Sequence, residues 1–435
     1  MIARAPDHWQ GNERPATGLV WAAPTARCAP EEDPLPTAPQ AAAPSLALPP
    51  RSRRAGSAKT SPVRDLLALT ERPEVISFAG GLPAPELFDL EGIRMAFDAA
   101  LGSPGVLQYS TSEGDPMLRD EIARRYCADG LPTEPSDLIV TTGSQQGLGL
   151  LATTLIDPGD TILVEEPCYL AALQTFALAG ARVVGVPYIG DGLDLEALEQ
   201  LAAEHAPKFF YTVPTFQNPT GRTHGLEARR AIATIAQRRG FRIIEDEPYR
   251  QLRYSGDALP SLSEFAPEHV ISLGSFSKVI APGLRIGWIR TTVDIRSSVT
   301  IAKQAADLHT STIDQAAAAH YLASDRGEPA LARIREAYAA RRDAMLDALS
   351  SALPEGSAWN RPDGGMFIWA RLPEGMDAAS SLTRALTRDV AYVPGTSFFS
   401  GRPDERTLRL SFTTYSPARI MEGLSRLGTT WGAGR

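Results

Sequence analysis

The sequence predicts an α/β fold: a large domain with a mostly parallel, seven-stranded-type sheet covered by helices, and a smaller α+β domain. The first observation is the repeated alternation of short apolar runs with helical patterns through the middle of the chain, which is typical of a parallel sheet. The second is that shorter strands and helices alternate after about residue 357. The third is the length of 435 residues, which is enough for more than one domain.

The predicted strands and helices follow one another closely from residue 138 onward. The strands of the large sheet are expected at 138–142, 161–164, 182–186, 209–213, 241–244, 269–273 and 286–290. The helices are expected at 91–101, 117–128, 148–155, 193–205 and 226–239, with one long helix over 303–322 and an amphipathic helix around 331–349. The small-domain strands are expected in the segments 365–369, 390–395 and 408–412.

The N-terminal region has a different composition from the rest. Residues 1 to about 53 hold ten of the 35 prolines and show no sustained period, so residues 1–57 are predicted to be a disordered Pro/Ala-rich tail. A start codon assigned too far upstream and a tail that covers a neighbouring subunit are both open explanations. A helix is expected from Ser61 and Pro62, and residues 58–105 are expected to pack with the small domain. The large domain is placed at 106–305 and the small domain at 306–435.

Composition excludes several classes of protein. The formal charge of -8 gives no basic footprint for nucleic acid, and no run of 18 apolar residues could cross a membrane. Three cysteines and six scattered histidines show neither a disulfide framework nor a metal-ligand pattern. We therefore expect no nucleic-acid partner, no membrane partner and no metal, and a cytoplasmic location.

Polar and glycine residues gather where the predicted strands end. Gly143-Ser144, Tyr169, Asn218, Asp246 and Lys278 all lie at or just beyond such ends. In open parallel sheets ligands bind beyond the carboxyl ends of the strands. Gly143-Ser144 also opens a helix, where free N–H groups and the helix dipole favour a single phosphate. The spacing matches neither a Walker loop nor a dinucleotide fingerprint.

Lysine is unusually scarce in this chain. Lys and Arg total 43, but only four are lysines: Lys59, Lys208, Lys278 and Lys303. Lys278 lies among small residues in Gly274-Ser275-Phe276-Ser277-Lys278, after a buried strand. A lysine amine forms a Schiff base with an aldehyde only when its pKa is lowered. From the local stretch alone, a solvated surface lysine is an equal alternative.

Together, these motifs resemble the fold-type I pyridoxal-phosphate aminotransferases of class I/II. The resemblance rests on Ser275-x-Ser277-Lys278 with Arg285, Asn218-Pro219-Thr220-Gly221, Asp246-x-Pro248-Tyr249 and Arg409, in this order. It covers about residues 58–430. The stretches 76–83 and 107–110 resemble the branch of 2-aminoadipate and kynurenine aminotransferases. Each motif alone is weak, because a turn, a cap or a core tyrosine would explain it equally well.

The resemblance implies a role for each matched residue. Lys278, Asp246 and Tyr169 would be catalytic: Lys278 binds the cofactor and moves the α-proton, Asp246 keeps the ring nitrogen protonated, and Tyr169 stacks on the ring. Pyridoxal 5'-phosphate would be held by Ser144, Gln145, Asn218, Tyr249, Ser275, Arg285 and, from a neighbouring subunit, Tyr109. The substrate would contact Arg409, Gly81 and Asn218. Shared sites imply a homodimer.

The implied function is an aminotransferase. It would move the amino group of an aromatic, aminoadipate-like or aliphatic α-amino acid to a 2-oxo acid, with 2-oxoglutarate as the expected acceptor. Racemisation, decarboxylation or amino-acid oxidation on the same fold is an alternative, because those reactions share the cofactor residues. An aminotransferase-like transcriptional regulator is a third, and the Pro-rich tail shows no helix-turn-helix pattern to support it.

Overall fold

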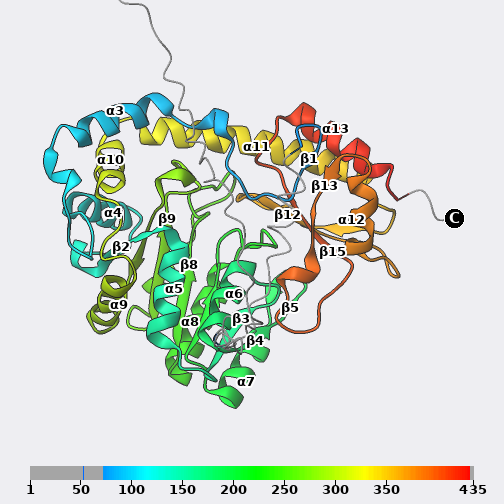
Figure 1. Cartoon of the computed structure of the whole chain (residues 1–435). Helices are drawn as coiled ribbons and strands as arrows, with labels where there is room; N and C mark the ends of the chain where they lie inside the picture. Colours follow the sequence, from blue (N-terminus) through cyan, green and yellow to red (C-terminus); the bar gives the residue numbers. More distant parts are fainter. Residues whose placement is uncertain (1–51, 53–71, 432–435) are drawn as a thin grey trace, which may run out of the picture. The chain divides into compact units, whose positions relative to one another are not determined.

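The large sheet has seven strands, all but one of which run in the same direction. A computed structural model of the chain describes residues 52 and 72–431. Its strands are, in spatial order, β2 (Leu138–Thr142), β10 (Ile286–Arg290), β9 (Val270–Ser275), β8 (Arg242–Asp246), β7 (Phe209–Thr212), β3 (Thr161–Glu165) and β4 (Arg182–Val186). Only β10 is antiparallel to its neighbours. The predicted α/β class and mostly parallel sheet are confirmed (Figure 1).

Helices cover both faces of this sheet, which explains why its strands are nearly continuous apolar runs. Successive residues of β3 show the two faces: Ile162 packs in one core cluster with Leu148 of α5, whereas Leu163 packs in another with Leu198 of α7. The helices of the large domain are α4 (Pro116–Ala128), α5 (Gly143–Leu155), α6 (Leu170–Ala179), α7 (Leu195–His205), α8 (Leu226–Arg239) and α9 (Val293–Ala306). A short hairpin joins β5 (Tyr188–Ile189) and β6 (Gly192–Leu193).

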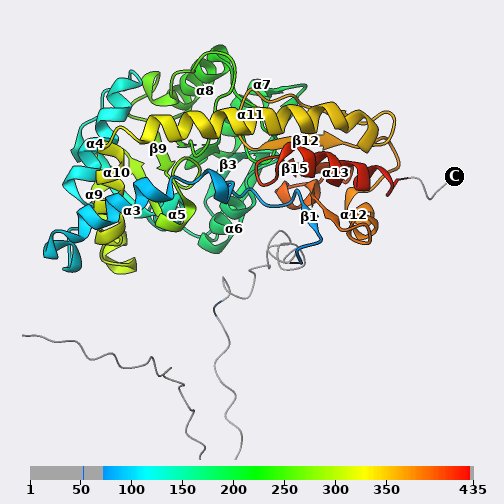
Figure 2. The ribbon, with the colours of Figure 1, turned by 90° about the horizontal axis from the view of Figure 1, so that it is seen from above.

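A second, smaller sheet is built from the C-terminal part of the chain. Its spatial order is β11 (Ala358–Trp359), β12 (Phe367–Arg371), β15 (Thr407–Ser411) and β14 (Val393–Pro394), all antiparallel. The helices α11 (Gly327–Ala352), α12 (Ala378–Leu386) and α13 (Pro417–Gly428) accompany it. Figure 2 shows α11 running alongside both sheets. These elements match the predicted α+β character.

The segment before residue 105 contacts both sheets. β1 (Ile76–Ser77) pairs in parallel with β13 (Val390–Ala391) beside the small sheet. By contrast, α3 (Leu90–Leu101) packs on α10 (Thr312–Ala323), which in turn packs on α4 and β10 of the large domain. Part of the stretch assigned to the small domain therefore lies against the large one. The boundaries at residues 57, 105 and 305 stay predictions.

The single long helix expected over 303–322 is wrong. The structure ends α9 at Ala306 and begins α10 at Thr312. Leu308 has φ of 65°, a left-handed conformation that no α-helix accommodates. A new helix starts after this residue because Ser311 is the N-cap of α10, its side chain accepting from Asp314 N. Beside the break, the buried Nζ of Lys303 donates to Asp307 Oδ1 at 2.9 Å and to Thr310 Oγ1 at 2.9 Å, which satisfies a buried ammonium.

Several sequence predictions concern residues outside this description. The tail over 1–57 and the helix starting at Ser61 and Pro62 lie among undescribed residues. Within the described residues, no helix is long and apolar enough to cross a membrane. Over the same residues, no three His, Cys, Asp or Glu side chains gather as metal ligands would.

Candidate active site

A cavity of about 280 Å³ opens at the carboxyl ends of β3, β7, β8 and β9. It is lined by Gly81, Ser144, Gln145, Tyr169, Val213, Asn218, Asp246, Pro248, Tyr249, Ser275, Ser277, Lys278, Pro282, Arg285, Phe367 and Arg409. Every predicted site residue except Tyr109 is among them. The residues at the strand ends of the large sheet thus meet in one space, as predicted, and Phe367 and Arg409 of the small sheet join them.

Lys278 lies in the turn that follows β9 and points its amine into the cavity. Its Nζ donates to the Gly81 carbonyl oxygen at 2.9 Å. Burial lowers the pKa of Lys278 to about 8, with further contributions from the positive charges of Arg409 and Arg285. The unprotonated amine is therefore accessible near neutral pH, as Schiff-base chemistry requires.

Asp246 is the last residue of β8 and is almost fully buried at 2% exposure. The Tyr211 hydroxyl donates to its Oδ2 at 2.8 Å. Its Oδ1 has no hydrogen-bond partner among the described residues. Burial raises the pKa of Asp246 to about 7, although the bond from Tyr211 opposes the rise. This carboxylate thus has one buried oxygen without a hydrogen-bond donor, and a cationic donor would satisfy it best.

Arg409 crosses from the small sheet to the large one. From β15 its Nη1 donates to Asn218 Oδ1 at 2.7 Å and its Nη2 donates to the Ala79 carbonyl at 2.6 Å. The guanidinium lies 4.3 Å from the centre of the Phe367 ring, in cation–π contact. Its buried Nε lacks a partner among the described residues. Burial lowers the pKa of Arg409 to about 10, so the side chain remains cationic at neutral pH.

Asn218 and Tyr249 are neighbours in the lining of the cavity. Asn218 Nδ2 donates to the Tyr249 hydroxyl at 3.4 Å. Burial raises the pKa of Tyr249 above its ordinary value, so its hydroxyl keeps its proton and can donate it. Tyr169, at the N-cap of α6, also stays neutral, because burial raises its pKa to about 12.

The opposite end of the cavity is suited to an anion. Gly143 has φ of 75°, and a Cβ there would lie 2.5 Å from Arg285 Nη2, so glycine lets this guanidinium lie against the start of α5. Ser275 Oγ donates to Ser277 Oγ at 2.8 Å beside it. Gln145 lines the cavity, but its Nε2 donates to Thr175 Oγ1 at 2.9 Å. Helix N–H groups, hydroxyls and an arginine, here called the anion cradle, are groups chemically suited to a phosphate.

Tyr109 lies outside this cavity. Its side chain is 79% exposed, and its ring contacts the His309 ring edge-to-face at 5.9 Å. It cannot contact a ligand in the cavity of its own subunit in this conformation. Its predicted role in a neighbouring subunit stays a prediction.

Two residues that shape the site were not singled out from the sequence. Phe367 supports the Arg409 guanidinium and also limits the space at Gly81, where a Cβ would lie 2.7 Å from its Cζ. Tyr211 is the sole described partner of Asp246. Both lie inside apolar strands, where an aromatic residue is ordinary, so only the pairing of strands reveals them.

The cavity fits pyridoxal phosphate. It offers an amine of lowered pKa, a buried carboxylate for a protonated ring nitrogen, two donors for a phenolic oxygen and a cradle for phosphate. Asp246 Oδ1 and Arg409 Nε are a buried acceptor and a buried donor that no described protein group satisfies. The predicted residues therefore suit the expected cofactor chemically.

Comparison with known proteins agrees with this geometry. The family described as "Aminotransferase class I and II" matches residues 79–427. A 2-aminoadipate transaminase of Thermus thermophilus is 42% identical over 86% of this chain and 94% of its own length. Aromatic-amino-acid aminotransferase 1 of Thermococcus litoralis is 42% identical over 87% and 93%. A solved kynurenine aminotransferase of Pyrococcus horikoshii, in complex with PMP, superposes with a TM-score of 0.83 at 40% identity, over 87% of this chain and 96% of that one.

These relatives confirm the predicted family, fold, cofactor and type of activity. The chain belongs to the aminotransferase class I and II family, as a fold-type I amino-acid aminotransferase whose cofactor is pyridoxal phosphate.

Proposed function

We propose that this enzyme transfers the amino group of aromatic, aminoadipate-like or aliphatic amino acids to 2-oxoglutarate, with Lys278 as the residue that moves the proton. The observation that carries the proposal is the convergence of Lys278, the unpartnered Asp246 oxygen and the anion cradle in one cavity. Bound pyridoxal phosphate supplies the aldehyde that exchanges the amine and a ring that withdraws electrons. The protein residues bind, orient and move protons around it.

Each cavity residue has a distinct proposed task. Asp246 holds a proton on the ring nitrogen, because its buried carboxylate is stabilised by a cationic partner. Asn218 and Tyr249 donate to the phenolic oxygen, and Tyr169 stacks on the ring. Ser144, Gln145, Ser275 and Arg285 bind the phosphate. All of these residues line the cavity.

Substrate recognition is assigned to Arg409, with Gly81 and Asn218 beside it. The planar fork of Arg409 suits an α-carboxylate, and its Nε is free to donate among the described residues. The neighbouring Phe367 and Tyr169 rings give an apolar surface for varied side chains. The printed names of the relatives, which include 2-aminoadipate and aromatic amino acids, support this range.

A donor panel tests the proposed reaction. Purified protein loaded with pyridoxal phosphate is incubated with single amino acids and 2-oxoglutarate, and glutamate is measured. We expect glutamate with several aromatic or long-chain donors. Loss or inversion of the donor without any glutamate would instead support racemase, decarboxylase or oxidase chemistry on this fold.

The functional unit is proposed to be a homodimer in the cytoplasm, with Tyr109 completing the partner's phosphate site. Three large apolar side chains are exposed near one another: Leu107 at 68%, Tyr109 at 79% and Leu308 at 43%. Leu107 is two residues from Tyr109, and the Tyr109 ring contacts His309, the residue after Leu308. The segment 307–310 also contacts Thr142 and Gln146 at the start of α5, beside the cradle. An exposed apolar surface next to a site is typical of a protein interface.

Mixed dimers test the shared site. Tyr109→Ala and Lys278→Ala, each inactive or nearly so, are mixed, allowed to exchange subunits and assayed. If Tyr109 acts in the partner subunit, each mixed dimer has one complete site, and activity returns to roughly a quarter of the wild-type value when two subunit types combine at random. Mixtures that stay inactive after proven exchange would rule out the shared site.

A further inference from the structure

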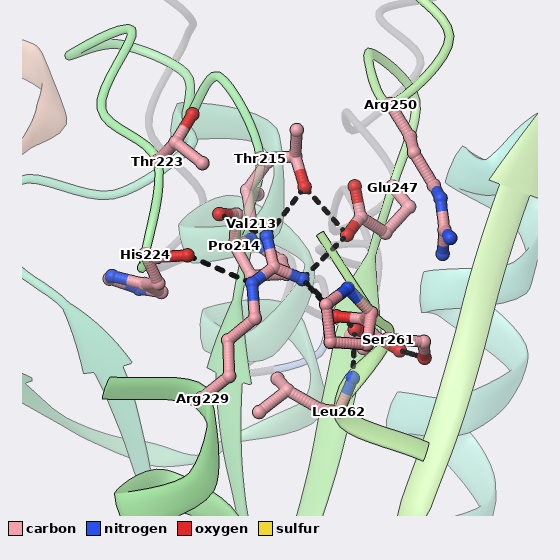
Figure 3. A network of polar contacts seen from close by, with 12 residues as sticks. Val213, Pro214, Thr215, Thr223, His224, Arg229, Glu247, Arg250, Ser261 and Leu262 are labelled. Atoms are coloured by element: carbon pink, nitrogen blue, oxygen red, sulfur yellow. Dashed lines mark hydrogen bonds and ion pairs between the residues drawn. The ribbon is translucent and has the colours of Figure 1, made fainter. Parts of the chain in front are cut away.

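The buried guanidinium of Arg229 is one anchor of the loop that carries Asn218; buried Glu165 is another, accepting from Val213 N at 3.2 Å and from Gln217 Nε2 at 3.1 Å. Arg229 lies in the first turn of α8 and has an exposed fraction of 0%. Its Nη2 donates to the Pro214 carbonyl at 2.8 Å, and its Nε donates to the His224 carbonyl at 2.9 Å. Figure 3 shows these bonds reaching both ends of the loop 214–224. One side chain therefore contacts both ends of the loop, which are also joined directly by the bond from His224 N to the Pro214 carbonyl at 2.9 Å.

Arg229 also contacts the segment that carries Asp246. Its Nη2 donates to Thr215 Oγ1 at 2.8 Å, and Thr215 Oγ1 donates to Glu247 Oε1 at 2.8 Å. Arg229 Nη1 lies 3.6 Å from the same Glu247 oxygen (Figure 3). Because side chains alternate along a strand, the neighbours of Asp246 face away from the cavity and toward α8. The guanidinium thus links the loop after β7 to the end of β8.

The loop needs such an anchor. Phe216, two residues before Asn218, has φ of 52°, in the left-handed region. A left-handed conformation is unfavourable for an ordinary residue and persists only where the surroundings impose it. The Asn218 side chain donates toward Tyr249 and accepts from Arg409, so its placement depends on the loop conformation.

We infer that Arg229 is a positioning residue for the reaction: it holds the loop 214–224 against the end of β8 so that Asn218 meets the cofactor's phenolic oxygen. Arg229 does not line the cavity and touches no reacting atom. The inference rests on the proposed role of Asn218. A planar guanidinium is required, because only a fork can donate to both loop ends and to Thr215 at once.

The readout is the pH midpoint of the visible absorption change of the cofactor-loaded protein without substrate. A donor at the phenolic oxygen favours its anionic form, so losing Asn218 raises this midpoint. The variants are Arg229→Lys, which keeps the charge but loses the fork, and Thr215→Val, which removes only the bridging hydroxyl. Asn218→Ala and the double variant with Arg229→Lys complete the set.

Arg290→Lys is the matched control. Arg290 also donates to a loop, through Nε to Thr133 Oγ1 at 2.9 Å and Nη2 to the Pro132 carbonyl at 3.0 Å. It is the last residue of β10, where it pairs with Leu138 of β2 and Ser272 of β9, toward the end of the strands opposite the cavity. We expect this variant to lower Tm without moving the midpoint.

We expect Asn218→Ala to raise the midpoint by about one pH unit and Arg229→Lys by at least about half a unit. The double variant should match Asn218→Ala alone, because both changes act through the same side chain. A midpoint for Arg229→Lys equal to that of the control would overturn the inference. If Arg229→Lys does not fold, Thr215→Val decides in the same way, with a smaller upward shift expected. If Asn218→Ala itself leaves the midpoint unchanged, the proposed role of Asn218 fails, and the inference about Arg229 fails with it.

Discussion

Replacing Asp246 by Asn should separate cofactor binding from catalysis. Asparagine keeps the shape of the side chain but removes the charge that would balance a protonated ring nitrogen. In the structure Asp246 is 2% exposed and its Oδ1 has no described partner, so little else compensates for the lost charge. Breaking a buried charge pair costs about 3–5 kcal/mol. At 1.4 kcal/mol per tenfold change, this corresponds to a fall in kcat/KM of roughly 10²- to 10³-fold or more.

The assay is a single turnover of amino transfer from a good donor. The change in absorption of the cofactor-loaded enzyme is the readout. Tyr211→Phe is the matched control, because it removes the bond to Oδ2 and leaves the carboxylate charged. One hydrogen bond to a charged group is worth about 1.5–3 kcal/mol, so this control should lose roughly 10- to 100-fold. An Asp246→Asn enzyme within fivefold of wild type would refute the assigned role of the carboxylate.

Three further predictions follow from the same cavity. Arg409→Lys loses the fork that contacts Asn218 and Ala79, so we expect KM for the amino donor to rise by roughly 30-fold or more; an unchanged KM would contradict the assignment. Gly143→Ala forces a left-handed alanine whose Cβ meets Arg285, so cofactor Kd, measured by fluorescence titration, should rise about tenfold, and an unaltered Kd would count against the cradle. Without cofactor, Asp246 has a pKa of about 7 in the folded protein, in place of its ordinary 3.8. The free energy of unfolding therefore falls as pH rises from about 4 to about 7, because the folded protein must give up a proton that the unfolded chain has already lost. Asp246→Asn should therefore raise the Tm of the cofactor-free protein at pH 8 but not at pH 4, and equal effects at both would disprove the shift.

Most of the residues of the site could be predicted from their position at the ends of predicted strands. Asp246, Asn218 and Lys278 each follow an apolar strand, and parallel strands bring such ends to one edge. The succession of strands and helices along the chain was thus enough to predict that these residues lie close together. The role of each one came from the family resemblance, because a turn or cap would use the same residue types.

Other features depended on contacts that no local pattern shows. The break between α9 and α10 is accompanied by the contacts of buried Lys303 with residues 307–310 and with distant Gln146. Phe367 and Arg409 meet only because β12 and β15 are adjacent. Nothing in the sequence distinguishes Arg229 from the other arginines of α8, and its burial follows from the loops around it.

The central claim is that Lys278 carries the cofactor and the proton. The most direct test is borohydride reduction of the loaded enzyme, followed by proteolysis and mass spectrometry, with Lys278→Ala in parallel. The described lysines offer two alternatives, buried Lys303, which is paired with Asp307, and Lys208, which lies near Asp160. We predict one phosphopyridoxyl label, on Lys278, and neither label nor turnover in Lys278→Ala. A label on another lysine, or normal turnover without Lys278, would contradict the account.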